Sequence, residues 1–436
     1  MVFCLVILKF RGMERKRIVI IGGGFAGLNL ARKLAKSDCE IVLVDKQNHH
    51  MFQPLFYQVA SARLEPSNIS FPFRAIFRRR KNVDFRYATV NRIRPEENIV
   101  ETSMGEIAYD ELVIATGCKT NFFGDPELEK NTLAMKTTQQ TIHIRNTILA
   151  KFEKIMFVNN LQEEEELMNL VIVGAGPTGV ELSGAFVEMK TKVLPHDYPH
   201  YDFSKLKIVL LEGSPNTLNA MSDKSRTWSR KYLEKMGVEV RTSTVVSSYD
   251  GHNLTLKNGE TIPTQTVIWA AGVQGNVLPG LEKATMVRAR YTVDRNSLVN
   301  GYSNVYAIGD ISYMETEKYP QGHPQLANVA INQGKTLANN FRARWSGGKM
   351  TPFEYKDKGT MATVGKFKAV VELPNFKFQG YFAWIVWMAL HLMLILSIRN
   401  KIAVFFNWAW RYITGDTSLR LILRDERDRE LTRRND

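Results

Sequence analysis

Two glycine-rich segments, far apart in the chain, have the spacing that lets a backbone approach pyrophosphate. The first reads Gly22-Gly23-Gly24-Phe25-Ala26-Gly27, and the second reads Gly174-Ala175-Gly176-Pro177-Thr178-Gly179. In such a motif the first glycine permits a tight turn, the second admits the phosphates, and the third lets the next helix pack closely on a strand. The amide groups and the positive dipole end of that helix then face the anion. We therefore predict two dinucleotide-binding folds.

Each motif is preceded by an apolar run and followed by a helical stretch, a second apolar run and an acid. Asp45 closes the run 41–44, and Glu212 closes the run 208–211. Glu212 stands farther from its motif because the polar stretch 190–207 reads as an insertion. A carboxylate at this position accepts a hydrogen bond from a free ribose 2′-hydroxyl and repels a 2′-phosphate. We therefore expect the second site to prefer NADH over NADPH.

Three more predicted strands end in residues that fit the ligand-binding edge of a dinucleotide-binding fold. The segments 112–117 and 267–272 are apolar runs that end in small residues, and the segment 305–310 ends in Gly-Asp. We expect cofactor contacts at these ends, and Asp310 could hold a hydroxyl group of a flavin ribityl chain. The residues concerned are Thr116, Gly117, Gly272, Gly309 and Asp310.

The order of these segments resembles that of the flavoproteins with two dinucleotide-binding domains, in which the NAD domain is inserted into the FAD domain. The resemblance implies an α/β fold with two Rossmann-like domains. Residues 13–120 and 275–345 would bind FAD, and residues 121–274 would bind NADH. Residues 346–436 would form a C-terminal membrane-anchoring region with amphipathic helices.

Cysteine usage narrows the choice within this superfamily. The chain has 3 cysteines, Cys4, Cys39 and Cys118, and none of them forms a CxxC pair. The disulfide reductases carry a redox pair shortly after the first glycine motif, and sulfide:quinone oxidoreductases need cysteines in later segments. Neither pattern occurs here, so we expect no thiol relay, and we interpret Cys118 as a structural thiol. No metal site is expected either.

The segment His50–Ala60, the Pro-Thr-Gly-Val-Glu of residues 177–181 and the tail resemble the type II NADH dehydrogenases (NADH:quinone oxidoreductases), from Arg17 to Leu423. The resemblance implies non-covalent FAD, hydride transfer from NADH to flavin N5, and two electrons passed to a membrane quinone without proton pumping. It also implies a homodimer in a respiratory chain, peripheral on the cytoplasmic side of the cell inner membrane. Lys46, Gln53 and Ala327 become further cofactor-contact candidates.

Four residues are candidates for the chemistry itself. Glu181, two residues after Gly179, could relay a proton or position the nicotinamide; the alternative is a carboxylate that only balances the helix dipole. The family carries an Ala-Gln-x-Ala-x-Gln pattern near flavin and quinone, and the ungapped register here places Asn328 and Asn332 at those positions, with Gln325 and Gln333 beside them. A helix cap or packing surface is the simpler interpretation of these amides.

The tail and the net charge bear on partners. Residues 381–398 are almost continuously apolar, and residues 402–413 are aromatic and basic. A pair of helices lying in the membrane interface fits better than one span or a buried core or dimer helix. The net charge is +14, and the cluster Arg74–Lys81 suits anionic lipid or nucleic acid; we expect lipid and no nucleic acid.

Two rival interpretations remain open. One is a soluble NAD(P)H:ferredoxin-type reductase, and the other is a flavoprotein resembling apoptosis-inducing factor that acts through binding. The segment 2–8 is apolar but lacks the basic start and the cleavage site of a signal peptide. Met13 is a candidate for the true start of the chain.

Overall fold

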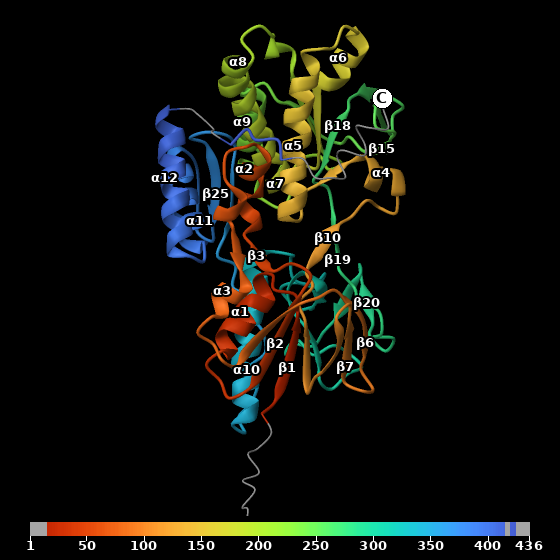
Figure 1. Ribbon diagram of the computed structural model, residues 1–436, viewed down its shortest axis with the longest axis vertical. Coiled ribbons are helices and arrows are strands. Elements are labelled where there is room, and N and C mark those ends of the chain that lie inside the picture. The colour runs from red at the N-terminus through yellow and green to blue at the C-terminus, as the bar shows by residue number, and fades with distance from the viewer. Residues whose placement is uncertain (1–14, 415–418, 424–436) are drawn as a thin grey trace, which may run out of the picture. The chain divides into compact units, whose positions relative to one another are not determined.

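The computed structural model describes residues 15–414 and 419–423 (Figure 1). The candidate start at Met13 and the apolar segment 2–8 lie outside the described residues. The chain divides into two compact units. Unit 1 comprises the chain up to His50, Pro72–Cys118 and Gln274–Tyr355. Unit 2 comprises Met51–Phe71, Lys119–Val273 and the chain from Lys356 onward, so the tail groups with the second unit.

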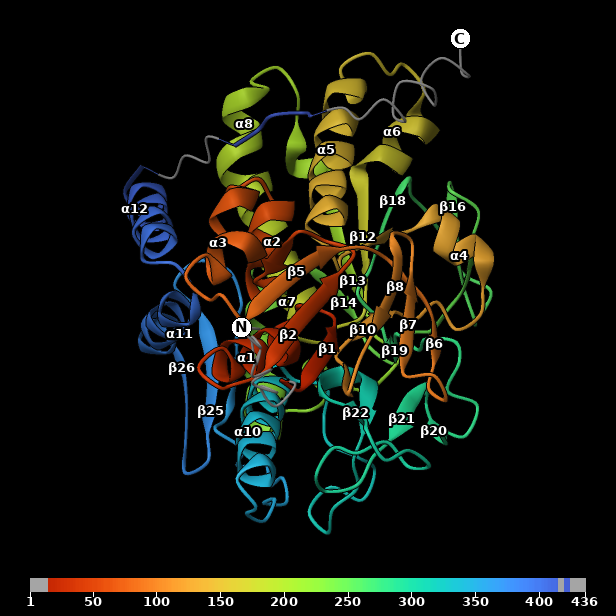
Figure 2. The same cartoon turned by 60° about the horizontal axis from the view of Figure 1, so that its bottom comes forward.

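Unit 1 is built on a parallel sheet with the strand order β22-β9-β1-β2-β5. Figure 2 shows β1, β2 and β5 side by side. After their first residues, β1 and β9 consist of buried aliphatic residues, and the Val-Tyr-Ala of β22 is buried as well, as expected for a parallel sheet covered on both faces. The strands are β1 (Arg17–Ile21), β2 (Glu40–Asp45), β5 (Val83–Tyr87), β9 (Glu111–Ile114) and β22 (Val305–Ala307).

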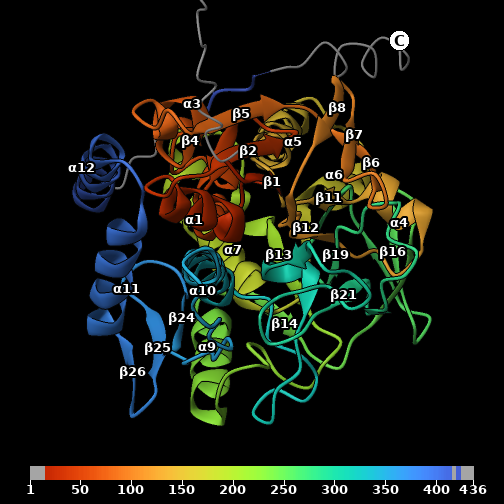
Figure 3. The same ribbon diagram turned by 90° about the horizontal axis from the view of Figure 1, so that it is seen from below.

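Two helices of unit 1 pack against each other beside this sheet. Helix α1 (Phe25–Leu34) follows the first glycine motif, and α10 (Ala327–Trp345) lies along it, as Figure 3 shows. The contact is close because a Cβ atom on Gly334 of α10 would overlap the carbonyl oxygen of Ala26. Small residues therefore fix the spacing of these helices.

The remaining elements of unit 1 are short. They are α3 (Phe73–Phe77), β6 (Val90–Arg94), β7 (Ile99–Thr102), β8 (Gly105–Ala108), β20 (Met286–Val287), β21 (Arg290–Thr292), the 3-10 turn η5 (Gly309–Ile311) and β23 (Ser312–Tyr313). Strands β6, β7 and β8 form an antiparallel sheet whose buried residues join the core beneath β9 and β22. Strands β3 (His49–Met51), β4 (Ser70–Pro72), β10 (Cys118–Thr120) and β19 (Val273–Gly275) lie where the chain passes from one unit to the other.

Unit 2 repeats the parallel plan, with the strand order β11-β18-β12-β13-β14. These strands are β11 (Leu133–Ala134), β12 (Asn169–Val173), β13 (Lys207–Leu211), β14 (Glu239–Arg241) and β18 (Thr266–Trp269). An antiparallel sheet of β15 (Val246–Tyr249), β16 (Asn253–Leu256) and β17 (Thr261–Pro263) shares their core. The helices are α2 (Phe56–Ala60), α4 (Pro126–Asn131), α5 (Thr138–Ile155), α6 (Leu161–Met168), α7 (Pro177–Glu188), α8 (Leu194–Asp197) and α9 (Asp223–Lys235), with the π-helical turn Met189–Val193 between α7 and α8.

The C-terminal part of unit 2 is a small sheet followed by two helices. The sheet is antiparallel and comprises β24 (Thr360–Thr363), β25 (Ala369–Leu373) and β26 (Phe376–Gly380). Helix α11 (Tyr381–Leu394) lies along it in Figure 3, and α12 (Ile398–Thr414) follows. Trp387 and Trp408 are buried on the inner sides of these helices. Within the described ranges, no helix is long and apolar enough to cross a membrane.

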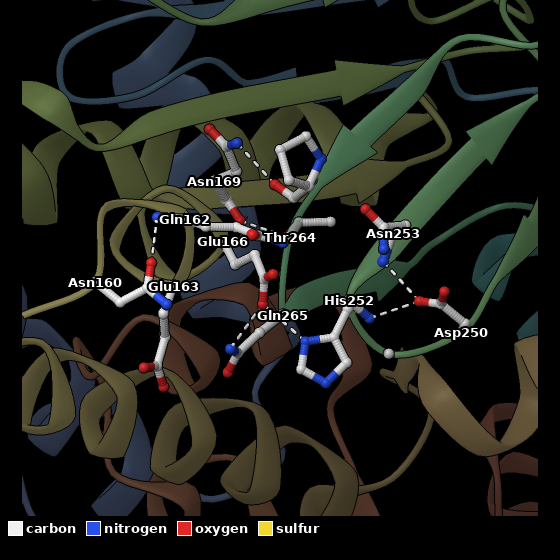
Figure 4. A network of polar contacts seen from close by, with 12 residues as sticks. Asn160, Gln162, Glu163, Glu166, Asn169, Asp250, His252, Asn253, Thr264 and Gln265 are labelled. Atoms are coloured by element: carbon white, nitrogen blue, oxygen red, sulfur yellow. Dashed lines mark hydrogen bonds and ion pairs between the residues drawn. The ribbon is translucent and has the colours of Figure 1, made fainter. Parts of the chain in front are cut away.

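A buried carboxylate of α6 contacts two turns near the start of β12 (Figure 4). Glu166 Oε2 lies 2.7 Å from His252 Nδ1 and accepts a hydrogen bond from Gln265 Nε2 at 3.0 Å. Asn169, the first residue of β12, belongs to the same network. Since β12 runs from here to the turn at Gly174, the network lies at the far end of the strand from the predicted ligand-binding edge. Its contacts tie α6 to the antiparallel sheet.

Candidate active site

The first glycine turn leaves an opening at its middle glycine. A Cβ atom on Gly22, where φ is +103°, would overlap the backbone of Ala115, and one on Gly27 would overlap the carbonyl oxygen of Gly22. Gly24 has φ −65° and no atom within 4 Å of the position of a Cβ. The first and third glycines are therefore required by the protein itself, whereas the second borders free space. That is the space a pyrophosphate needs, so the turn fits a dinucleotide.

The second glycine turn has the same construction. A Cβ atom on Gly174, where φ is +104°, would come within 2.8 Å of the backbone of Ala270, and one on Gly179 would overlap the carbonyl oxygen of Gly174. Gly176 again has open space on its Cβ side. Pro177 starts α7 at a position where no amide hydrogen is needed, and the exposed Thr178 follows it.

Both acids lie beside their glycine turns. The Asp45 carboxylate accepts hydrogen bonds from the amide groups of Gly23, at 2.6 Å, and Gln47, at 2.7 Å. The Glu212 carboxylate accepts from the amide groups of Ala175, at 2.7 Å, and Ser214, at 2.8 Å. Each carboxylate therefore binds the second residue of its own motif.

Burial raises the pKa of Asp45, and the amide donors of Gly23 and Gln47 lower it. The positive charge of the exposed Lys46 adds a smaller lowering of the same pKa. Phe25 lies nearby, with its ring edge to face against the ring of His50 at a centroid distance of 5.1 Å.

Several other predicted contact residues of unit 1 gather at the strand ends. A Cβ atom on Gly309 would lie 3.1 Å from Cβ of Ala26, which places the turn after β22 against the start of α1. The backbone carbonyl of Asp310 accepts a hydrogen bond from Gln325 Nε2 at 3.0 Å, and the Asp310 carboxylate accepts one from Cys118 Sγ at 3.0 Å. Cys118, predicted as a structural thiol, thus contacts a candidate cofactor residue.

Thr116 and Gly117 are held by one asparagine. The hydroxyl of Thr116 donates to the carbonyl oxygen of Asn276 at 2.8 Å, and the amide of Asn276 donates to the carbonyl oxygen of Gly117 at 3.0 Å. These contacts fix the loop that follows β9.

The amides of α10 fall into two groups. Gln333 is buried, accepts a hydrogen bond from the amide of Gly309 at 2.6 Å and contacts the hydroxyl of Ser312. Asn328 and Asn332 are half-buried and, in the part of the chain that the structure describes, their side chains form no hydrogen bond. Ala327 is the first residue of the helix.

Gln333 is not among the four candidates for the chemistry, although its position along the helix distinguishes it. It follows Val329 and Ala330 at helical spacing and precedes Leu337, so it lies on the buried stripe of the helix. A buried amide on such a stripe is expected to have a specific partner.

Two further predicted cofactor residues, outside the second glycine turn, belong to unit 2. Gln53 is exposed, and its side chain donates to the carbonyl oxygen of Lys136 at 3.1 Å. Gly272 follows β18, where a Cβ atom would lie 3.0 Å from the ring of Phe123. Phe123 itself is largely exposed and has φ +56°. Gln53 therefore belongs to unit 2, whereas Gly24 and Asp45 belong to unit 1.

Glu181 is a buried acid on α7, the helix that starts in the second glycine turn. It lies on the inner face of α7, where its Oε1 accepts a hydrogen bond from the amide of Thr363 at 3.3 Å. Burial raises the pKa of Glu181 to about 8, against the opposing hydrogen bonds from Thr363. A carboxyl group with a pKa near neutrality can hold or release a proton under ordinary conditions.

Comparisons with known proteins agree with this geometry. Residues 16–334 match the pyridine nucleotide-disulphide oxidoreductase family, and residues 358–416 match the NDH2 C-terminal domain. Two type II NADH:quinone oxidoreductases of Mycobacterium tuberculosis, Ndh and NdhA, are 32% and 34% identical to this chain. The matches cover 92% and 90% of this chain, and 89% and 86% of the relatives. The fold matches that of NDH2 from Plasmodium falciparum in complex with NADH, with a TM-score of 0.86, 20% identity, and coverage of 94% of this chain and 100% of that one.

Proposed function

Because this chain belongs to the type II NADH:quinone oxidoreductases, we propose that it oxidises NADH and reduces a quinone without pumping protons, with FAD bound at the first glycine turn. The observation that carries this proposal is the pair of glycine turns, each with an open middle glycine and a carboxylate beside it. When bound, FAD supplies a centre that accepts a hydride from NADH and passes two electrons to a quinone.

The residues of unit 1 would hold FAD without a covalent bond. The turn at Gly24 admits the pyrophosphate, and Asp45 accepts the ribose hydroxyl. Asp310 would face the ribityl chain, and its position is supported by the contacts of Gln325 and Cys118 with the same residue. The amides Asn328 and Asn332, together with Gln325, stay candidates for contact with the quinone.

The residues of unit 2 would bind NADH and supply the proton. Gly176 admits the pyrophosphate, and Glu212 selects a free 2′-hydroxyl over a 2′-phosphate. Reduction of a quinone consumes two protons. The pKa of Glu181, about 8, leaves its carboxyl group protonated at neutral pH, so that it can donate a proton and be reprotonated.

The tail would attach the enzyme to the membrane surface as a peripheral protein. The outer sides of the two C-terminal helices expose large apolar residues, among them Tyr381, Phe382, Ile385, Met393, Ile398, Ile402, Phe405, Phe406, Trp410 and Ile413. Each such side chain contributes roughly 1.5–3 kcal/mol when it leaves water. Arg399 and Lys401 add roughly 1 kcal/mol each near anionic lipid. The homodimer and the cytoplasmic side of the inner membrane stay predictions.

The direct test is NADH oxidation by the purified full chain with a soluble quinone analogue, with and without added FAD. We expect NADH-dependent reduction of the quinone that is strongest when FAD is saturating. A protein that reduces ferredoxin but not the quinone would favour the first rival interpretation. A protein that binds flavin but turns over neither acceptor would favour the second.

A further inference from the structure

A chain of buried hydrogen bonds leads from the last helix to Glu181. The indole of Trp408, on α12, donates to Gln58 Oε1 at 2.8 Å, and Gln58 Nε2 donates to the hydroxyl of Tyr57 at 3.0 Å. The hydroxyl groups of Tyr57 and Thr363 are 3.1 Å apart. The amide of Thr363 donates to Glu181 Oε1 at 3.3 Å. The hydroxyl of Thr363 lies close enough to this carboxyl group to lower its pKa. All five residues are buried and belong to unit 2.

The direction of these hydrogen bonds follows from the first donor. An indole N–H can donate but cannot accept, so Trp408 requires the oxygen of the Gln58 amide to face it. The NH₂ group of Gln58 must then face Tyr57, whose oxygen accepts. The hydroxyl hydrogen of Tyr57 is left to point at Thr363. The hydroxyl hydrogen of Thr363 is in turn left to point at the Glu181 carboxyl group.

We propose that Thr363 and Trp408 are positioning residues for Glu181. Thr363 presents its hydroxyl hydrogen to the carboxyl group of Glu181. Trp408 fixes the direction of the series of hydrogen bonds, and this direction leaves the Thr363 hydroxyl free to donate to Glu181. This inference rests on the role of Glu181 in the proposed function. It gives the C-terminal domain a part in the reaction besides attachment, because β24 carries Thr363 and α12 carries Trp408.

The other ionisable groups around this chain are paired or neutral. On α7 itself, Glu188 accepts from Arg411 at 2.6 Å and lies 3.1 Å from Arg63. On α11, burial lowers the pKa of His391 to about 4, so this side chain is neutral near pH 7. Burial raises the pKa of Tyr57 and also that of Tyr412 on α12, which keeps both phenols neutral. Among these groups, Glu181 is the one whose charge changes near neutral pH.

The titration of Glu181 can be followed without any substrate. We suggest infrared spectroscopy of the full chain with its flavin, in which the band of the protonated carboxyl group is assigned by its loss in Glu181→Gln and is followed as pH rises. A donated hydrogen bond favours the charged carboxylate, so its removal raises the pKa. We expect Thr363→Val to raise the apparent pKa of Glu181 by about one pH unit, the equivalent of a lost hydrogen bond to a charged group.

Three further variants test the mechanism and its direction. Thr363→Ser keeps the hydroxyl group and should restore the wild-type pKa. Trp408→Phe frees the Gln58 amide to turn, so it should raise the pKa of Glu181 by less than Thr363→Val does. Tyr57→Phe should leave that pKa unchanged, because Thr363 still donates to the carboxyl group. Trp345→Phe is the matched control, since its indole nitrogen forms no hydrogen bond in the described structure.

The inference would be overturned by either of two results. One is a Thr363→Val protein whose Glu181 titrates as in the wild type. The other is a Tyr57→Phe protein in which the pKa of Glu181 falls, because the Thr363 hydroxyl would then have been donating to Tyr57. A Trp408→Phe protein that matches Trp345→Phe would remove Trp408 from the proposal. Failure of the proposed function would show instead as a wild-type protein that does not pass electrons from NADH to a quinone.

Discussion

The two dinucleotide folds share their ligand-binding edge but differ in the helix behind it. In both folds the middle glycine is open, and a carboxylate binds the amide of the residue before it. The buried face of α1 consists of Gly27 and of aliphatic and alanine residues, whereas the buried face of α7 includes Glu181. The two edges are therefore built to admit the same class of ligand, and the buried acid of α7 distinguishes the fold that we assign to proton transfer.

The elements that pack on α1 and on α7 also differ. Helix α1 is covered by α10, whose Gln333 accepts a hydrogen bond from the amide of Gly309. Helix α7 is covered in part by β24, and a Cβ atom on its Gly184 would come within 2.5 Å of the backbone of Gly365. The C-terminal domain therefore packs on the helix with the ionisable group. In our proposal, this difference corresponds to cofactor binding by the first fold and proton transfer by the second.

The largest effect is expected when a side chain fills the open space beside Gly24, the middle glycine of the first turn. Gly24→Val places a branched side chain where we assign the pyrophosphate, and the φ of −65° means that the substitution does not strain the backbone. We expect a folded protein without flavin, measured by the flavin absorbance of the purified chain. Gly24→Ala should lose flavin only in part. Full flavin content in Gly24→Val would show that FAD does not bind at this turn.

The buried acid offers a second test of the difference between the folds. Glu181→Gln removes the proton donor and should lower quinone reduction by about 100-fold, within the usual range for general acid catalysis. Its FAD content should be unchanged because α1 is untouched. Glu163→Gln, a change at a more exposed acid of α6, is the control. Wild-type turnover in Glu181→Gln, measured with saturating NADH and quinone, would contradict the assignment.

The surface of the tail gives a third test. We expect the double substitution Phe406→Glu and Trp410→Glu to weaken binding to anionic lipid vesicles at least 100-fold, because two exposed apolar side chains are lost. Met104→Glu is the control, since Met104 is exposed in unit 1. Point substitutions are preferable to a deletion after Gly380, because the deletion would also remove the buried Trp387 and Trp408. Unchanged flotation with vesicles would exclude this surface.

The pH dependence of stability tests the raised pKa of Glu181, the buried acid that α1 lacks. The pKa of Glu181 is raised, to about 8, so the folded state binds this proton more tightly than the unfolded state does. The contribution of Glu181 to stability is therefore fully present below about pH 4.5 and is lost as pH rises to about 8. We expect the melting temperature of the wild type to fall relative to that of Glu181→Gln across this interval. A difference that does not change with pH would contradict the raised pKa.

Nucleotide preference is the smallest expected effect. Glu212→Gln keeps the shape of the side chain but removes its charge, so repulsion of a 2′-phosphate weakens. We expect the ratio of kcat/KM for NADH to that for NADPH to fall about tenfold, the equivalent of one charged hydrogen bond. The flavin should stay bound. A variant with an unchanged ratio would remove Glu212 from the adenosine site.

The parts of the fold that sequence predicts well are those set by local spacing. The glycine turns are fixed by three residues within six positions, and each acid lies at the end of the next strand, so both could be placed from the chain alone. The sequence predicts two C-terminal helices but misplaces the break between them. α11 ends at Leu394 and α12 begins at Ile398, so the polar residues 399–401, expected to separate the helices, lie in the first turn of α12.

The surroundings of Glu181 could not be predicted in this way. Tyr57 and Thr363 are 306 positions apart, and no periodic pattern links them. The burial that raises the pKa of Glu181 comes from packing between α7, α2 and β24, which depends on tertiary structure. The same holds for the contact between Cys118 and Asp310. Polar contacts between residues so far apart in the chain can be identified only from the three-dimensional structure.

The central claim is that the first fold holds flavin and the second presents NADH. It is tested most directly by rapid mixing of Gly176→Val with NADH in the absence of oxygen. The account predicts a protein that keeps its flavin absorbance yet shows no reduction by NADH, whereas wild type is bleached at once. A Gly176→Val protein that is reduced as fast as wild type, or one that has lost its flavin, would contradict it.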